Sequence, residues 1–200
     1  MTAMPTTGHP LPLRERKKLR TRQALAETAV AMFTERGFDS TTLDELVEAV
    51  EVSKRTFFRN FTSKEDVALA AVKQLWDTVL QVLAERPPSG PLLGGIKDAL
   101  LTAIDRMDDH WYRQFLPTVR LIDAHPALHA HSLRYCAEVE EEMIRLLPGP
   151  PTLELRLLVE IAVVAWNVAL AGWSPSGDRA QLPVLVDRTF AAIPAALALE

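Results

Sequence analysis

Apolar side chains recur at intervals of three and four residues over most of the chain, which is the spacing of one buried helix face. The first such stripe consists of Leu25, Ala29, Met32 and Phe33. It predicts a helix from about Arg14 to Arg36, ended by Gly37 in a left-handed cap. No strand-like alternation of useful length interrupts the pattern, so we expect an all-α fold.

The next stretch predicts a short helix from about Thr42 to Val50. Its apolar side chains share one face: Leu43, Leu46, Val47 and Val50. The hydroxyl of Thr41 or Thr42 can accept a hydrogen bond from an orphan amide of the first turn. Asp44 or Glu45 then lies three residues later, as a capping box requires. The segment therefore contains the capping residues that begin a helix.

A second short helix follows a turn at Glu51, with Ser53 as its cap and Phe57 and Phe61 on its inner face. The opposite face offers charged, hydroxyl and amide groups: Lys54, Arg55, Thr56, Arg59 and Asn60. Such groups donate to base edges and phosphates in DNA grooves. A helix whose only role is packing does not need this surface.

At these residues the sequence resembles the TetR family of transcriptional regulators. The resemblance runs from the helix that ends at Gly37 through four short motifs: Thr41-Thr42-Leu43, Val52-Ser53, Thr56-Phe57-Phe58 with Phe61, and Ser63-Lys64-Glu65. It implies an all-α homodimer that binds double-stranded DNA and releases it when a small-molecule ligand binds. The domains expected are a disordered tail (residues 1–13), a three-helix helix-turn-helix DNA-binding domain (14–63) and a helical ligand-binding and dimerisation domain (64–200).

Two positions depart from the family pattern. Glu51 stands where the turn normally has Gly, and a non-Gly residue in the left-handed region costs about 1 kcal/mol. Phe58 stands where Tyr is more usual, so a phenol contact with phosphate is replaced by a phenyl ring. That ring can contact a thymine methyl group or a sugar instead.

The residues expected to contact DNA are Thr42, Lys54, Arg55, Thr56, Phe58, Arg59, Asn60 and Lys64. Arg59 and Lys54 can donate to guanine, and Asn60 can read adenine. Thr42, Thr56 and Lys64 suit phosphate. The alternative for the charged residues is a solvated helix face. The basic run from Arg14 to Arg22 has the same two interpretations: contact with DNA, or a solvated helix face.

Beyond residue 63 the pattern predicts six further helices, at about 64–85, 92–108, 111–124, 126–147, 152–173 and 181–197. The segment from Leu155 to Trp173 is apolar nearly all round. A helix of that kind needs cover on two sides. The second cover is either another copy of the chain, as the family implies, or a monomeric core.

The resemblance places a ligand pocket among the middle helices. The candidate lining residues are Met107, Trp111, Phe115, Arg120, Trp166 and Asn167. Aromatic and Met side chains suit a small apolar ligand, with Arg120 or Asn167 as polar anchor. The competing interpretation is that these rings simply fill a helical core.

Charge and composition favour some classes of function and argue against others. The net charge is −4, but residues 1–64 carry eleven Lys and Arg against eight Asp and Glu, a net of +3. DNA affinity depends on this local charge. The single Cys136, the lack of a secretory signal and the lack of an apolar run near the ~20 residues of a membrane span indicate a cytoplasmic protein without membrane attachment.

Catalytic and metal-binding patterns are missing from the sequence: it has no phosphate-binding Gly loop and no HExxH motif. Of the five His residues, His125, His129 and His131 lack a compelling partner for a metal site, and we expect no cofactor and no enzymatic activity. The chain is therefore interpreted as a ligand-responsive repressor that binds a near-palindromic operator. An activator, a constitutive regulator, or a helical carrier or enzyme without specific DNA binding are the alternatives.

Overall fold

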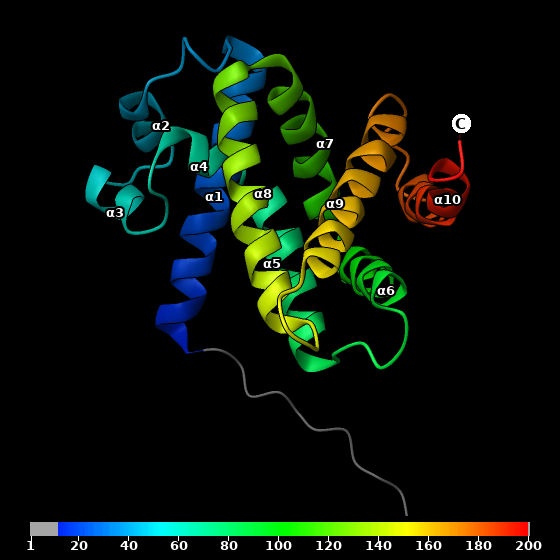
Figure 1. Ribbon diagram of the computed structural model, residues 1–200. Coiled ribbons are helices and arrows are strands. Elements are labelled where there is room, and N and C mark those ends of the chain that lie inside the picture. Colours follow the sequence, from blue (N-terminus) through cyan, green and yellow to red (C-terminus); the bar gives the residue numbers. More distant parts are fainter. Residues whose placement is uncertain (1–11, 200) are drawn as a thin grey trace, which may run out of the picture. The chain divides into compact units, whose positions relative to one another are not determined.

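The computed structural model describes residues 12–199, which form ten helices and no strand (Figure 1). One compact unit ends at Ser63, and a second begins at Lys64. The all-α class is thus confirmed. Residues 1–11 of the expected N-terminal tail lie outside the described residues, and Leu13 already belongs to the first helix.

The first unit contains α1 (Leu13–Arg36), α2 (Leu43–Ala49) and α3 (Lys54–Phe58). The predicted inner face of α1 is confirmed, because all four of its apolar residues are buried: Leu25, Ala29, Met32 and Phe33. Leu46 of α2 and Phe57 of α3 are completely buried as well. Gly37 ends α1 with φ 91° and ψ 148°. Its φ is positive as expected, but its ψ is extended, so the predicted left-handed helical cap was wrong in that detail.

The second unit contains the remaining helices: α4 (Lys64–Ala68), α5 (Ala70–Glu85), α6 (Leu92–Asp105), α7 (Asp109–Ala124), α8 (Pro126–Leu146), α9 (Leu153–Trp173) and α10 (Gln181–Ala196). Helix α5 packs against α6, α7 and α8, while α9 packs against α6, α8 and α10. Helix α6 stops at Asp105, three residues earlier than predicted. Asp108 instead caps α7, where its carboxylate accepts a hydrogen bond from the Trp111 amide at 2.8 Å.

The single helix predicted over residues 64–85 is interrupted. Leu69, with φ −89° and ψ 9°, separates α4 from α5 and is completely buried. Carbonyl groups on both sides of the break accept hydrogen bonds from α7: the Thr118 hydroxyl donates to Ala68 at 3.3 Å, and the Trp111 indole donates to Ala71 at 2.9 Å. A periodic apolar pattern does not reveal these bonds, because their donors lie some 40 and 50 residues away along the chain.

Helix α9 is buried on one side and exposed on the other. Eight of its residues are buried, including Trp166 and Trp173. Its outer face leaves Leu157, Val164 and Val168 each more than half exposed. With 21 residues and a mean hydropathy of 1.7 over an 18-residue window, α9 is long and apolar enough to cross a membrane by length and composition alone, contrary to our expectation from sequence. A helix with eight buried residues is typical of the core of a folded unit.

Candidate nucleic-acid interface

Helix α2, which leads into the turn before α3, starts from a complete capping box. The Thr42 hydroxyl accepts a hydrogen bond from the Glu45 amide at 3.2 Å, and the Glu45 carboxylate accepts one from the Thr42 amide at 2.7 Å. That second bond, with the bond from the Thr42 hydroxyl, lowers the pKa of Glu45. The predicted cap is confirmed, with Thr42 rather than Thr41 in the capping role.

Glu51 occupies the left-handed backbone region at the centre of this turn. Its φ is 54°, and it is the one non-Gly residue with positive φ among the described residues. The amide of Val52 then donates to the Val47 carbonyl at 2.9 Å, which closes the turn. The prediction that a side chain stands where the backbone favours Gly is confirmed.

Helix α3 is short but firmly anchored. Its start is capped by Ser53, whose hydroxyl accepts a hydrogen bond from the Thr56 amide at 3.2 Å. Phe57 and Phe61 are both buried, with ring centroids 5.9 Å apart. The inner face predicted from the sequence is therefore confirmed, and the opposite face of α3 is left for other contacts.

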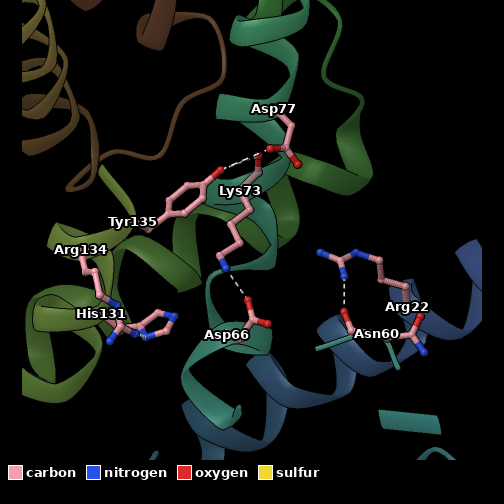
Figure 2. A network of polar contacts seen from close by, with 8 residues as sticks. All are labelled: Arg22, Asn60, Asp66, Lys73, Asp77, His131, Arg134 and Tyr135. Carbon is pink, nitrogen blue, oxygen red and sulfur yellow. Dashed lines mark hydrogen bonds and ion pairs between the residues drawn. The ribbon is translucent and has the colours of Figure 1, made fainter. Parts of the chain in front are cut away.

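Arg22 of α1 contacts two residues that follow α3. Its guanidinium donates to the Asn60 carbonyl at 2.5 Å (Figure 2) and lies 4.3 Å from the centre of the Phe61 ring. Cation–π contact and a charge-assisted hydrogen bond thus act on adjacent residues. Sequence reasoning missed this role, since nothing distinguishes Arg22 from the other cations of its basic run.

The outer face of α3 brings four of the predicted residues together. Lys54, Arg55 and Arg59 are exposed cations, and the Phe58 ring is 55% exposed between them in sequence. Lys54 pairs with Asp44 of α2 at 2.7 Å. Both side chains of that pair are exposed to solvent, so the ion pair is weak and Lys54 can exchange Asp44 for another anion. This face therefore combines one exposed ring with three exposed cations.

Three other predicted residues are placed differently. Thr56 is half-buried, and its hydroxyl lies 3.1 Å from that of Ser53. The Asn60 amide donates inward to the Thr56 carbonyl at 2.7 Å, and its Oδ1 atom is buried. This geometry contradicts the expectation that Asn60 presents its amide to an adenine. Lys64 belongs to the second unit, as the first residue of α4.

The predicted ligand-binding residues do not form one cluster. Met107, Trp111, Phe115 and Trp166 are all buried. The rings of Trp111 and Phe115 stack with centroids 4.1 Å apart, and Trp166 lies 6.2 Å from Phe115. Arg120 and Asn167, the expected polar anchors, are exposed instead. Arg120 donates to the Ser174 carbonyl at 3.0 Å, so the structure does not support either residue as an anchor inside the core.

A polar network that the sequence did not reveal links α4, α5 and α8 (Figure 2). The buried Asp66 carboxylate pairs with Lys73 at 2.5 Å across the break at Leu69. The Lys73 ammonium also lies 4.9 Å from the centre of the Tyr135 ring. Burial, and then the positive charge of nearby Arg134, lowers the pKa of His131 beside this network. The two sides of the helix break are thus held by a specific ion pair.

Comparison with known proteins identifies relatives of this chain. Residues 25–71 match the family model described as bacterial regulatory proteins, tetR family. The chain is 33% identical over 177 residues to the HTH-type transcriptional regulator TcmR of Streptomyces glaucescens, covering 83% of this chain and 78% of TcmR. It is 22% identical over 115 residues to the negative transcriptional regulator IcaR of the biofilm operon icaADBC of Staphylococcus epidermidis, covering 58% of this chain and 60% of IcaR.

Solved structures share the fold. A transcriptional regulator from Aquifex aeolicus superposes with a TM-score of 0.54 at 16% identity, covering 88% of this chain and 99% of that protein. A transcriptional regulator from a Rhodococcus species gives a TM-score of 0.53 at 16% identity, covering 88% and 96%. At this level of identity the likeness concerns the helical fold alone.

Proposed function

The chain belongs to the TetR family of DNA-binding transcriptional regulators, and on this premise we propose that it is a cytoplasmic repressor. In this proposal a homodimer binds a near-palindromic operator, and a small apolar ligand releases it. Repression is supported by the relative IcaR, which is a negative regulator. The alternatives within the class are an activator and a constitutive regulator.

The observation that carries the proposal is the outer face of α3. Lys54, Arg55 and Arg59 extend into solvent from a segment whose inner rings are buried. Lys54 and Arg59 are assigned to guanine edges, and Arg55 to bases or phosphate. Phe58 is assigned to thymine methyl groups or sugars, which suits its exposed ring.

Phosphate contacts complete the assignment. The exposed Thr42 and the half-buried Thr56 lie at the starts of α2 and α3, where backbone amides add partial positive charge. Lys64 begins the second unit directly after the first, and is assigned to phosphate as well. Asn60 takes a structural role in this proposal, because its amide is turned inward.

A homodimer is supported by the exposed apolar surface of α9 and α10. Leu157, Val164, Val168 and Val184 are each 54–58% exposed. Asn167 lies on this same exposed side of α9. Exposed apolar surface of this kind marks interaction sites. Two-fold symmetry would present two α3 helices to successive major grooves about 34 Å apart, which calls for a near-palindromic site.

Ligand response is proposed to act through the aromatic cluster of the second unit. Trp111 stacks on Phe115 and also bonds the Ala71 carbonyl beside the helix break. A small apolar ligand that displaced this indole would remove a bond next to the α4–α5 break. Since α4 begins where the first unit ends, a change at the break would alter the spacing of the two α3 helices. A few ångströms of change would prevent simultaneous fit to two grooves.

Selection from a random-sequence DNA duplex library tests the regulator directly. The full-length protein should enrich one near-palindromic sequence, and Arg59→Ala, which removes a cation assigned to a guanine edge, should lose that enrichment. Arg86→Ala, which removes an exposed cation from the second unit, serves as the charge-matched control and should behave as wild type. A helical carrier or enzyme would enrich no sequence with any of the three proteins, which would refute specific DNA binding.

Sedimentation tests the dimer. Val164→Lys places a charge in the exposed apolar surface of α9 and should shift the protein toward monomer. Leu133→Lys makes the same kind of change at a residue of α8 with 55% exposure and should leave the dimer intact. Equal behaviour of the two variants would refute the assignment of this surface to dimerisation.

A further inference from the structure

The start of α1, from Leu13 to Thr21, and Arg59, the residue after α3, line an open depression of about 680 Å³ within the first unit. Arg14, Lys17 and Lys18 of α1 line it together with Arg59. Glu15 is the one acidic residue among those that line it, and the Thr21 side chain completes it. The wall of the depression is thus strongly cationic, and it includes a residue that directly follows the outer face of α3.

The four cations of this depression have no carboxylate partner among the residues that the structure describes. Within residues 12–199, no ion pair joins Arg14, Lys17, Lys18 or Arg59 to a carboxylate. Lys54, by contrast, is paired with Asp44 on the same unit. Gathering unpaired like charges raises the local positive potential, and a bound polyanion relieves it. The depression is open to solvent, which suits an extended anion rather than an enclosed small one.

Helix geometry separates the cations of α1 into two groups. Arg14 and Lys18 are four residues apart, so they lie on one face, on the side of the depression. Arg16 and Arg20 are also four residues apart, and they lie roughly on the opposite face at 100° per residue. They are equally exposed but do not line the depression. The helix therefore provides two pairs of cations of equal charge on roughly opposite faces.

We propose that this depression is a second DNA-contact surface, which binds backbone phosphates of the duplex next to the bases that α3 reads. Arg14, Lys17 and Lys18 supply the charge, and Arg59 joins this surface to the outer face of α3. Phosphate contacts position a protein on DNA without carrying sequence information. The proposal rests on the DNA-binding function proposed above, and it assigns to the start of α1 a role that a merely solvated basic helix would not have.

The test compares two double variants of the full-length protein: Arg14→Ala/Lys18→Ala and Arg16→Ala/Arg20→Ala. Each removes two positive charges from the same turns of α1. Duplex affinity is measured by fluorescence anisotropy between 50 and 300 mM salt, on the selected operator and on a scrambled duplex. The slope of log K against log[salt] falls by about 0.9 for each phosphate that the protein no longer neutralises. Circular dichroism checks that α1 remains helical.

We expect Arg14→Ala/Lys18→Ala to lower the slope by about 0.9 for each phosphate released, by equal amounts on both duplexes, so that the ratio of operator to scrambled affinity stays constant. Arg16→Ala/Arg20→Ala should keep the wild-type slope. Glu15→Gln should raise affinity on both duplexes, because it removes the one carboxylate from the depression.

Equal slope changes for the two double variants would overturn the proposal, since a general charge effect would explain both. A lower operator preference in Arg14→Ala/Lys18→Ala would also overturn it, because these residues would then be reading bases. Failure of the proposed function looks different: the wild-type protein would bind both duplexes equally. The two failures are therefore separable in one set of titrations.

Discussion

Replacing Glu51 by Gly should stabilise the turn between α2 and α3. The residue has a φ of 54°, where a side chain costs about 1–2 kcal/mol for lack of room around Cβ. Gly removes that cost but loses about 0.5–1 kcal/mol more backbone entropy on folding. The expected net gain is therefore about 0.5–1 kcal/mol in the opening free energy of the first unit.

Hydrogen exchange measured by mass spectrometry is the appropriate assay. All four Trp and both Tyr residues lie beyond residue 63, so intrinsic fluorescence does not report on the first unit. A gain of about 0.5–1 kcal/mol slows exchange of the α2 and α3 amides roughly two- to fivefold, provided that they exchange through opening of this unit. Peptides from the second unit serve as an internal reference and should not change.

Two controls isolate the backbone effect. Glu51→Ala removes the same charge but keeps Cβ, so it should not slow exchange to the same extent. Glu48→Gly introduces Gly at an exposed position inside α2, and it should destabilise by about 1 kcal/mol because the helix interior disfavours Gly. If Glu51→Ala slowed exchange as much as Glu51→Gly, relief of charge rather than of backbone strain would be the cause, and the reasoning would be refuted.

Three further outcomes are expected. Thr42→Ala removes the capping box and should weaken α2 by about 1 kcal/mol, seen as faster exchange of its first-turn amides; unchanged exchange would contradict the capping role. Asp66→Ala leaves the Lys73 ammonium unpaired. Breaking a buried pair costs about 3–5 kcal/mol, less here because Lys73 is partly exposed, and Asp66→Ala/Lys73→Met should recover much of the loss in urea titrations followed by Trp fluorescence. Burial, and then the nearby Glu160 carboxylate, raises the pKa of Glu140 to about 7. The folded protein thus binds this proton more tightly than the unfolded chain does, and the resulting stability is lost as pH rises through 7. Glu140→Gln should therefore stabilise the second unit at pH 8 but not at pH 5, and an equal effect at both pH values would exclude the titration.

Local signals along the chain were sufficient for the first unit. The Thr42 hydroxyl and the Glu45 carboxylate lie three residues apart, so the capping box follows from spacing alone. The burial of Phe57 and Phe61 also follows from their spacing, whereas the left-handed backbone at Glu51 was expected from the resemblance to the family pattern, which has Gly at that position. Capping, turn conformation and helix amphipathicity involve contacts within a few residues, and these are the interactions that a single sequence displays.

The predictions from sequence were less accurate for the second unit. Helical periodicity located its helices to within a few residues, but it predicted one helix where Leu69 separates α4 from α5. The ligand pocket that the resemblance implied offered Arg120 and Asn167 as polar anchors, although both are exposed. Each error concerns which side chains meet across the unit. That depends on how α7 and α9 pack, and sequence spacing does not specify the packing.

The sequence by itself determined the all-α class, the two short helices with their caps and the cationic face of α3. The tertiary structure alone decided that Arg22 holds the Asn60 carbonyl, that the Asn60 amide turns inward, and that Arg59 shares a depression with the start of α1. The physical reason is the range of the interactions. Caps and amphipathic faces depend on residues within one or two helical turns of each other. The Arg22 guanidinium, by contrast, reaches the Asn60 carbonyl 38 residues away only after the helices have packed.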